Sequence, residues 1–309
     1  MIKKFQTLEK RLAAAGNGNP KRSVEELAAH VMGCKPLDIY FKEVSTEQEA
    51  ELEALIARAE QGEPIQYIIG HVDFRGLEIQ CDPRALIPRP ETELLVEAVL
   101  NKVDEASSLV EQRQDAAATL KIADVCTGTG CIGLALAQEL PEAQVTAIDI
   151  SPEALTLAKE NAERLKLAGR FHMLESDLLG VFMVDEASSL VKSGRDAAST
   201  LEKKFDVVVS NPPYIFSNVW KNLEASVKEF EPQLALDGGE EGMDLIIPLV
   251  EQAARVLRPG GGLFLEIGHD QGQMVFQCLE KSGFQNVQII QDYADLDRIV
   301  CGTLPFGVR

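Results

Sequence analysis

The chain has 309 residues, of which 45% are hydrophobic, and this is enough for one substantial core and a smaller second domain. Acidic residues outnumber basic ones by 49 to 30, and the net charge of −19 argues against a protein whose main task is to hold nucleic-acid phosphates. No segment approaches the roughly 18 uninterrupted apolar residues of a membrane span, and Met1 leads into polar sequence, so we expect a soluble, cytoplasmic protein with no membrane partner.

The six cysteines and four histidines are dispersed along the chain. The only close pair of cysteines, Cys126 and Cys131, lies within apolar sequence and has no zinc-site spacing. We therefore expect neither a disulfide framework nor a metal site.

The N-terminal part of the sequence, residues 1–64, predicts a small bundle of three or four helices. Apolar residues recur there at spacings of three and four, and glycine and proline interrupt the pattern at two places. Residues 65–88 change to short β-like runs at 67–70 and 77–79, separated by 73–76. We interpret this segment as a β-hairpin linker between two domains.

Residues 89–309 alternate strand-like and helix-like segments after a helix expected to begin near Glu91. Ser151 and Pro152 are typical of a helix start. This alternation predicts an α/β domain with an open, mostly parallel sheet and helices on both faces. The seven strands are expected at 121–126, 144–150, 170–174, 205–210, 262–267, 287–290 and 298–301, and further helices at 131–140, 152–167, 242–257 and 271–282.

One polar, alanine-rich segment occurs twice. Residues 103–110 recur as 184–191, and the similarity continues to Leu120 and Leu201. Two copies cannot form a solenoid, and neither fits the α/β rhythm. We interpret residues 103–120 and 184–201 as surface insertions without a catalytic role.

A glycine loop follows the first strand of the α/β domain. Gly128 and Gly130 allow a tight turn that brings the backbone close to a ligand, and the following helix offers free N–H groups. Together with Gly133 they also satisfy the spacing of a dinucleotide fingerprint, so an NAD enzyme and a methyltransferase both remain possible at this point.

Acidic residues follow the next two strands. Asp149 ends the second strand, where its carboxylate could accept hydrogen bonds from both ribose hydroxyls of NAD or of S-adenosylmethionine. Asp177 and Leu178 follow the third strand, where contacts to the adenine edge usually arise. We expect all three residues to bind the cofactor.

The fourth strand ends in Asn211-Pro212-Pro213-Tyr214, which decides between the two cofactors. The two prolines fix the backbone, so that the Asn211 side-chain oxygen and the Pro212 carbonyl can both accept hydrogens from one NH₂ group. Tyr214 can cover the planar group that carries it. The segment therefore predicts methylation of a planar amide or amine nitrogen, which rests on proximity and needs no general base before attack.

These motifs together resemble the bacterial peptide chain release factor glutamine methyltransferases of the HemK/PrmC type. The resemblance covers nearly all of residues 65–302 except the two insertions, whereas the N-terminal helices match only in outline. The matching segments are residues 67–70, 74–77, 87–93, the glycine loop, 210–215, 231–236 and 266–272.

The resemblance implies a class I S-adenosylmethionine methyltransferase fold that methylates the glutamine of a Gly-Gly-Gln loop in class I release factors and leaves S-adenosylhomocysteine. It implies that Asn211 to Tyr214 hold the substrate glutamine. Cys126 stands where the family commonly has glycine, and Leu178 where an aromatic residue is frequent. The cofactor residues that it implies are Cys126, Thr127, Gly128, Thr129, Gly130, Asp149, Leu178 and Asn211.

Several alternatives remain from the sequence. A nucleic-acid amino-group methyltransferase could use the same tetrapeptide on a flipped base, but the acidic charge argues against it. Glutamine methylation of a ribosomal protein is harder to exclude, whereas an NAD oxidoreductase or a binding module leaves the tetrapeptide unexplained. We expect a monomer whose residues 1–64 dock the protein substrate. Arg89, Glu91 and Glu93 could form a wall of the active site or a clasp between the domains.

Overall fold

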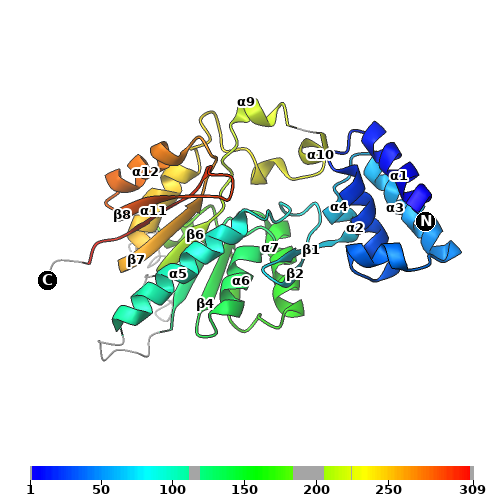
Figure 1. Cartoon of the computed structure of the whole chain (residues 1–309). Coiled ribbons are helices and arrows are strands. Elements are labelled where there is room, and N and C mark those ends of the chain that lie inside the picture. The colour runs from blue at the N-terminus through cyan, green and yellow to red at the C-terminus, as the bar shows by residue number, and fades with distance from the viewer. Residues whose placement is uncertain (1, 111–118, 184–204, 224, 307–309) are drawn as a thin grey trace.

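The computed structural model describes residues 2–110, 119–183, 205–223 and 225–306. The N-terminal helices lie at one end of the molecule, and a large sheet with its covering helices lies at the other (Figure 1). The chain between the sheet and the next long helix carries the short helices α9 (Ser217–Trp220) and α10 (Ala225–Lys228). Figure 1 shows this chain running from the sheet toward the N-terminal helices.

The N-terminal helices follow from the apolar spacing and from residues that cap each run. α2 ends at Gly33, which adopts a left-handed φ of 57°, and α3 begins with a capping box between Ser45 and Gln48. The inward faces meet in one apolar cluster that includes Leu12 and Leu27. The elements are α1 (Ile2–Ala14), α2 (Pro20–Met32), η1 (Pro36–Phe41), α3 (Thr46–Glu60) and α4 (Ile65–Ile69).

The hairpin lies slightly later in the chain than the sequence predicts. The run expected as its first strand is helical, because α4 buries Ile65 and Ile68 in the N-terminal cluster and ends at Gly70 with a left-handed φ of 87°. The strands are β1 (His71–Phe74) and β2 (Leu77–Gln80). Arg75 and Gly76 connect them with φ values of 51° and 75°, as a two-residue hairpin turn requires. A short apolar run does not by itself distinguish strand from helix.

The main sheet has seven strands in the order β5-β4-β3-β6-β7-β9-β8. All neighbouring pairs are parallel except those that involve β9, which runs antiparallel to β7 and β8. The predicted α/β fold with a mostly parallel seven-stranded sheet is therefore confirmed. The strands are β3 (Lys121–Val125), β4 (Gln144–Asp149), β5 (Phe171–Glu175), β6 (Phe205–Ser210), β7 (Leu257–Glu266), β8 (Gln285–Gln291) and β9 (Asp297–Thr303).

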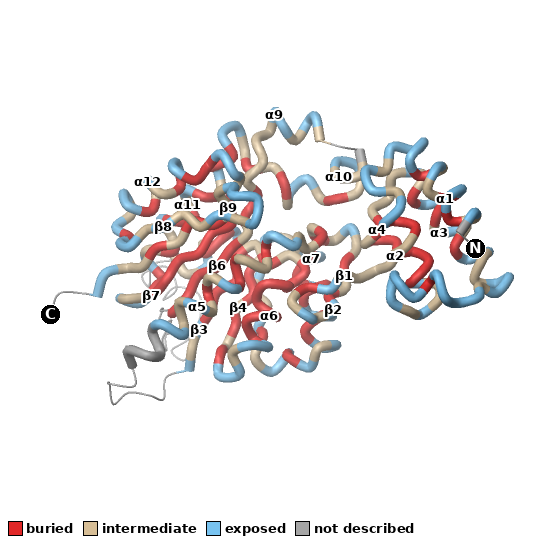
Figure 2. The backbone as a smooth tube through the Cα atoms, in the orientation of Figure 1, coloured by how far each residue is buried: buried red, intermediate tan, exposed pale blue. Residues whose placement is uncertain are grey.

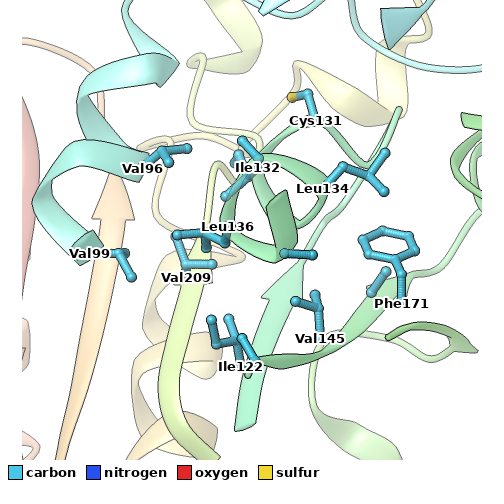
Figure 3. Packing of buried hydrophobic residues seen from close by; sticks show 14 of the residues in the cluster. Val96, Val99, Ile122, Cys131, Ile132, Leu134, Leu136, Val145, Phe171 and Val209 are labelled. Carbon is cyan, nitrogen blue, oxygen red and sulfur yellow. The ribbon is translucent and has the colours of Figure 1, made fainter. Parts of the chain in front are cut away.

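Helices cover both faces of the sheet, and the strands are buried between them (Figure 2). Alternate residues of one strand serve the two layers: Ile122 packs with α5, α6 and α7, whereas Ala123 packs with α11 and α12. Figure 3 shows Val96 and Val99 of α5 on the side of the helix where Ile132 and Val209 lie. These helices are α5 (Thr92–Val110), α6 (Cys131–Glu139), α7 (Pro152–Arg164), α11 (Ile246–Val256) and α12 (Gly272–Lys281).

Two helix starts illustrate how local and tertiary factors differ. Ser151 accepts a hydrogen bond from the Ala154 N–H and Pro152 is the first residue of α7, as the sequence predicts. In contrast, α11 begins at Ile246 rather than near residue 242, because Gly242 adopts a φ of 65° within a loop that packs against Tyr214.

The first copy of the repeated segment begins inside α5, which continues to Val110, and Val103 packs against the core below it. One partly buried residue of the helix therefore lies within the predicted insertion. Residues 111–118 and the second copy at 184–201 lie outside the described residues. In the described part of the chain, no helix combines the length and apolarity that crossing a bilayer demands.

Candidate functional site

The carboxyl ends of β3, β4, β5 and β6 meet at the point where the strand order reverses, which is where open α/β sheets bind ligands. A cleft of about 1040 Å³, including its open mouth, lies there. Most residues predicted from the sequence line it: Cys126, Thr127, Gly128, Thr129, Asp149, Asp177, Leu178, Asn211 and Pro213. Gly130, Pro212 and Tyr214, which were also predicted, are not among the residues that line it.

The glycines of the loop have different tasks. Gly128 faces the cleft with a φ of 55°, and a Cβ built on it would meet only Ala85 at 3.8 Å. A Cβ on Gly130 would come within 3.1 Å of Phe171. A Cβ on Gly133 would approach the Asp124 carboxylate to 2.8 Å. Close backbone approach to a ligand is therefore possible at Gly128, whereas the other two glycines allow α6 to pack on the sheet.

Asp124 anchors the loop from below, and the sequence analysis did not single it out. Its Oδ2 accepts hydrogen bonds from the Thr127 hydroxyl at 2.6 Å and the Gly133 N–H at 2.9 Å. The residue is fully buried, and its Oδ1 has no partner among the described atoms. Burial raises the pKa of Asp124 to about 7. The role of Asp124 could have been predicted from its carboxyl group, which stands within an otherwise apolar strand.

Asp149 joins the glycine loop to the start of α7. Its Oδ2 accepts a hydrogen bond from the Gly128 N–H at 2.9 Å, and its Oδ1 accepts one from the Ser151 N–H at 3.0 Å. The carboxylate keeps acceptor capacity for a further donor in the cleft. Burial raises the pKa of Asp149 despite these bonds. The residue therefore shapes the loop and also lines the cleft.

The segment after β5 forms another wall. Leu178 is buried and has a left-handed φ of 48°, which is uncommon for a leucine. The following Leu179 N–H donates to the side chain of Gln252 at 2.7 Å, so α11 holds this turn in place. The turn presents Leu178 and Asp177 to the cleft.

The side chains of Asn211 and Tyr214 belong to one buried polar network. Asn211 Nδ2 lies 3.2 Å from the Thr92 hydroxyl, which donates to Glu266 Oε2 at 2.7 Å. The Tyr214 hydroxyl donates to Glu266 Oε1 at 3.3 Å. Burial raises the pKa values of Glu266 and Tyr214. Thr92 and Glu266 lie within segments that the sequence analysis matched to a family, but neither was predicted as a site residue.

The backbone of the same tetrapeptide is clamped by a glycine-rich loop. A Cβ on Gly238 would lie 2.7 Å from the Pro213 carbonyl oxygen, and one on Gly242 would lie 2.4 Å from the Tyr214 carbonyl oxygen. Gln271, which is fully buried, donates from Nε2 to that Tyr214 oxygen at 3.1 Å. These contacts were not predicted, because they join segments that are distant in the sequence.

The loop that precedes α5 forms the remaining wall, with its arginines paired. Arg89 bonds at 2.5 Å to Glu231, whose other oxygen accepts the Ile87 N–H. Arg89 also lines the cleft, so it is both a wall residue and a clasp between two segments. Glu93 accepts the Arg75 N–H at 3.0 Å and ties α5 to the hairpin. Arg84, at the same wall, is paired with Asp82 and Glu160 at 2.7 Å each.

No group of histidine, cysteine, aspartate or glutamate side chains in the described residues has the arrangement of a metal site. The cleft is lined on one side by the glycine loop, the Asp149 carboxyl group and apolar residues, and on the other by Asn211 and Pro213. This combination suits a nucleoside-like ligand beside a small planar group that donates N–H bonds.

Comparison with known proteins agrees with this geometry. Residues 5–70 match the family described as the PrmC N-terminal domain, and residues 117–295 match a methyltransferase domain. The chain is 37% identical to the release factor glutamine methyltransferase of Koribacter versatilis, with 97% of each chain covered. It is 40% identical to that of Moorella thermoacetica, with 94% of this chain and 93% of the relative covered.

The hMettl16 catalytic domain superposes with a TM-score of 0.55 at 14% identity, covering 81% of this chain and 83% of that one. A likeness at this identity supports the fold alone. The sequence relatives extend over nearly the whole length of both chains. The chain is therefore an S-adenosylmethionine-dependent methyltransferase that belongs to the family of release factor glutamine methyltransferases.

Proposed function

We propose that this protein methylates the side-chain amide nitrogen of the glutamine in the Gly-Gly-Gln motif of class I peptide chain release factors. The observation that carries the proposal is the position of Asn211 and Pro213 in the cleft that also contains the glycine loop and Asp149. The names of the relatives, which cover more than nine-tenths of the chain, support this substrate over a nucleic-acid base.

The cleft fits S-adenosylmethionine in shape and charge. Asp149 keeps acceptor capacity for a ribose hydroxyl, and Gly128 leaves room for close approach. Buried Leu178 offers an apolar surface to the adenine. The arginines at the wall are neutralised by ion pairs, so that Asp149 and Asp177 favour a cationic ligand. When bound, S-adenosylmethionine supplies a methyl group on a positively charged sulfur.

The tetrapeptide then positions the substrate amide. Asn211 Oδ1, in the lining of the cleft, accepts one N–H bond of the glutamine amide. The adjoining Pro212 carbonyl and Tyr214 ring, which lie outside this lining, accept the second N–H bond and pack on the amide plane once the substrate has entered. The buried prolines keep the acceptors rigid and exclude water from the reacting nitrogen. Rate enhancement rests on this placement, and the methylated nitrogen afterwards loses its proton to solvent.

The tetrapeptide recognises an amide and its neighbours only, so selectivity between protein glutamines requires additional surface. The N-terminal helices supply it in our proposal. Leu37 and Phe41 on η1 are 75% and 89% exposed, which makes them candidates for contact with the release factor. We expect Phe41→Ser to raise KM for intact release factor several-fold and to leave turnover of a short Gly-Gly-Gln peptide unchanged. Equal effects on both substrates would contradict docking at this surface.

Mass spectrometry tests the substrate directly. Purified release factor is incubated with the full chain and methyl-labelled S-adenosylmethionine, and tryptic peptides are analysed for one added methyl group on the Gly-Gly-Gln glutamine. A release factor with glutamate at that position is the matched control and should remain unlabelled. Preferential labelling of a ribosomal protein or of DNA in competition would overturn the proposal.

A further inference from the structure

A buried hydroxyl and a buried carboxylate connect the substrate-holding asparagine to the interior. Thr92 is the first residue of α5 and Glu266 the last residue of β7, and they are 2% and 1% exposed. Glu266 lies 2.7 Å from the Thr92 hydroxyl on one oxygen and 3.3 Å from the Tyr214 hydroxyl on the other. The Thr92 oxygen lies 3.2 Å from Asn211 Nδ2. Four residues from three separate segments thus form one chain of hydrogen bonds.

The donor and acceptor roles in this chain of hydrogen bonds are fixed when Glu266 is ionised. A carboxylate only accepts hydrogen bonds, so the single Thr92 hydroxyl proton points to Glu266. The Thr92 oxygen can then only accept, and Asn211 must turn its NH₂ group toward it. The Asn211 carbonyl oxygen is consequently left for a donor other than Thr92. Without this chain the two ends of the asparagine amide would be nearly equivalent.

A role in stability alone explains Glu266 poorly. A buried carboxylate loses its hydration, and an apolar residue of similar size is usually no less stable at such a position. The charge of Arg298 favours the ionised form of Glu266, but Arg298 is itself paired with Asp292 at 3.1 Å. The carboxylate instead receives two hydroxyl donors: Thr92, which bonds to the first residue of the tetrapeptide, and Tyr214, which is its last residue.

We infer that Thr92 and Glu266 are positioning residues that orient the Asn211 amide, so that its oxygen accepts from the substrate and the site selects a primary amide over a carboxylate. This inference rests on the proposed function. Two acceptors, Asn211 Oδ1 and the Pro212 carbonyl, match the two N–H bonds of glutamine and repel the oxygens of glutamate. If the Asn211 amide took the opposite orientation, its NH₂ group would face the substrate, and the preference for glutamine over glutamate would weaken.

Substitutions of Thr92 separate orientation from packing. Thr92→Val keeps the shape and removes the hydroxyl, whereas Thr92→Ser keeps the hydroxyl and removes a methyl group. We expect Thr92→Val to lower kcat/KM for release factor about 100-fold, as misplacement of a reacting group does, and Thr92→Ser to stay within about threefold of the wild type. Affinity for S-adenosylmethionine, measured by calorimetry, should remain within about threefold for both variants.

Selectivity gives a readout that a structural role would not change. Inhibition constants are measured for release factors that carry glutamine or glutamate at the Gly-Gly-Gln position. We expect the ratio of the two constants to fall at least about fivefold in Thr92→Val and also in Glu266→Gln, whose amide can face Thr92 in either direction. Equal weakening of both ligands, with the ratio unchanged, would overturn the inference.

A measurement on the free enzyme keeps the inference testable if the proposed substrate is wrong. The side-chain NH₂ signals of Asn211, assigned by their loss in Asn211→Ala, report the hydrogen bond to Thr92 through proton exchange. We expect exchange to be about tenfold faster in Thr92→Val than in the wild type or in Thr92→Ser. Equal exchange rates in all three proteins would refute the orientation of Asn211 by Thr92. Absence of release factor methylation by the wild type would refute the proposed function alone.

Discussion

The two halves of the cleft are held by different kinds of contact. On the side proposed to bind the cofactor, Asp124 and Asp149 fix the glycine loop through hydrogen bonds to residues 3 to 21 positions away in the sequence. On the side proposed to bind the substrate, Asn211 bonds to a residue 119 positions away, and Tyr214 bonds to residues 52 and 57 positions away. The first half lies within the consecutive elements β3, α6 and β4, whereas the second forms only where elements distant in the sequence meet.

This difference predicts how the two halves respond to mutation. Changes on the cofactor side should alter affinity for S-adenosylmethionine or the stability of the loop, because the ligand contacts and the fold share the same residues. Changes on the substrate side should reduce turnover while the cofactor remains bound. Four experiments examine this division.

The largest effect is expected for Asn211→Ala. We expect turnover of release factor to fall at least about 1000-fold, which corresponds to about 4 kcal/mol, because the side-chain acceptor for the amide is lost. Affinity for S-adenosylmethionine, measured by calorimetry, should change by less than about tenfold. Asn218→Ala, on the exposed surface of α9, is the control. Retained turnover in Asn211→Ala would contradict the proposal that this half of the cleft holds the substrate.

The pH dependence of stability tests the anchor of the cofactor half. Asp124 has a folded-state pKa of about 7, above the unfolded value of 3.8. Between pH 3.8 and about 7, the Asp124 side chain ionises in the unfolded protein but stays protonated in the folded protein. Ionisation stabilises the unfolded state, so the free energy of unfolding decreases as the pH rises toward 7. Urea unfolding of wild type and Asp124→Asn should show their difference shifting against the wild type by about 2–3 kcal/mol between pH 5 and 8, at 1.36 kcal/mol per pKa unit.

The subtraction removes the titration of groups that both proteins share. A difference that is constant across this range would mean that Asp124 is ionised throughout in the folded state. An ionised Asp124 would need a hydrogen-bond donor at Oδ1, and the described residues provide none there.

The clamp around the tetrapeptide should be sensitive to a single methyl group. Gly242→Ala places a Cβ 2.4 Å from the Tyr214 carbonyl oxygen, and we expect it to cost about 2–3 kcal/mol of stability and to reduce turnover more than cofactor affinity. Gly283→Ala is the matched control, because Gly283 also has a positive φ, of 91°, but open space around its Cβ position. Thermal unfolding and steady-state kinetics measure both variants. Identical losses in the two would attribute the effect to backbone strain alone.

The smallest effect on catalysis is expected for Asp149→Ala. Loss of the carboxylate should weaken S-adenosylmethionine binding by about 1–3 kcal/mol, the scale of hydrogen bonds to a charged group. Turnover at saturating cofactor should change less than affinity does. Asp149→Asn keeps one acceptor oxygen, so its affinity for S-adenosylmethionine should lie between those of the wild type and Asp149→Ala. Unchanged affinity in calorimetry would show that the carboxylate serves only the Gly128 and Ser151 N–H groups.

The same division separates what could be predicted from the sequence and what could not. The glycine loop and Asp149 were predicted because a strand, a turn and a helix start leave their pattern in adjacent residues. The short run at 67–70 was wrongly predicted as a strand, because three apolar residues fit either period and burial against the N-terminal cluster decided for helix. Strand and helix order followed from periodicity, but the start of α11 depended on a glycine loop packed on Tyr214.

By itself, the sequence determined the α/β rhythm, the capped helices and the position of Asn211-Pro212-Pro213-Tyr214 at the end of a strand, because these depend on residue type and on spacing within a few turns. Only the tertiary structure brought Thr92, Glu266 and Gln271 to that tetrapeptide. The physical reason is that hydrogen bonds between residues more than 50 positions apart leave no periodic trace. Their partners are selected by which strand ends and helix starts the sheet order places side by side.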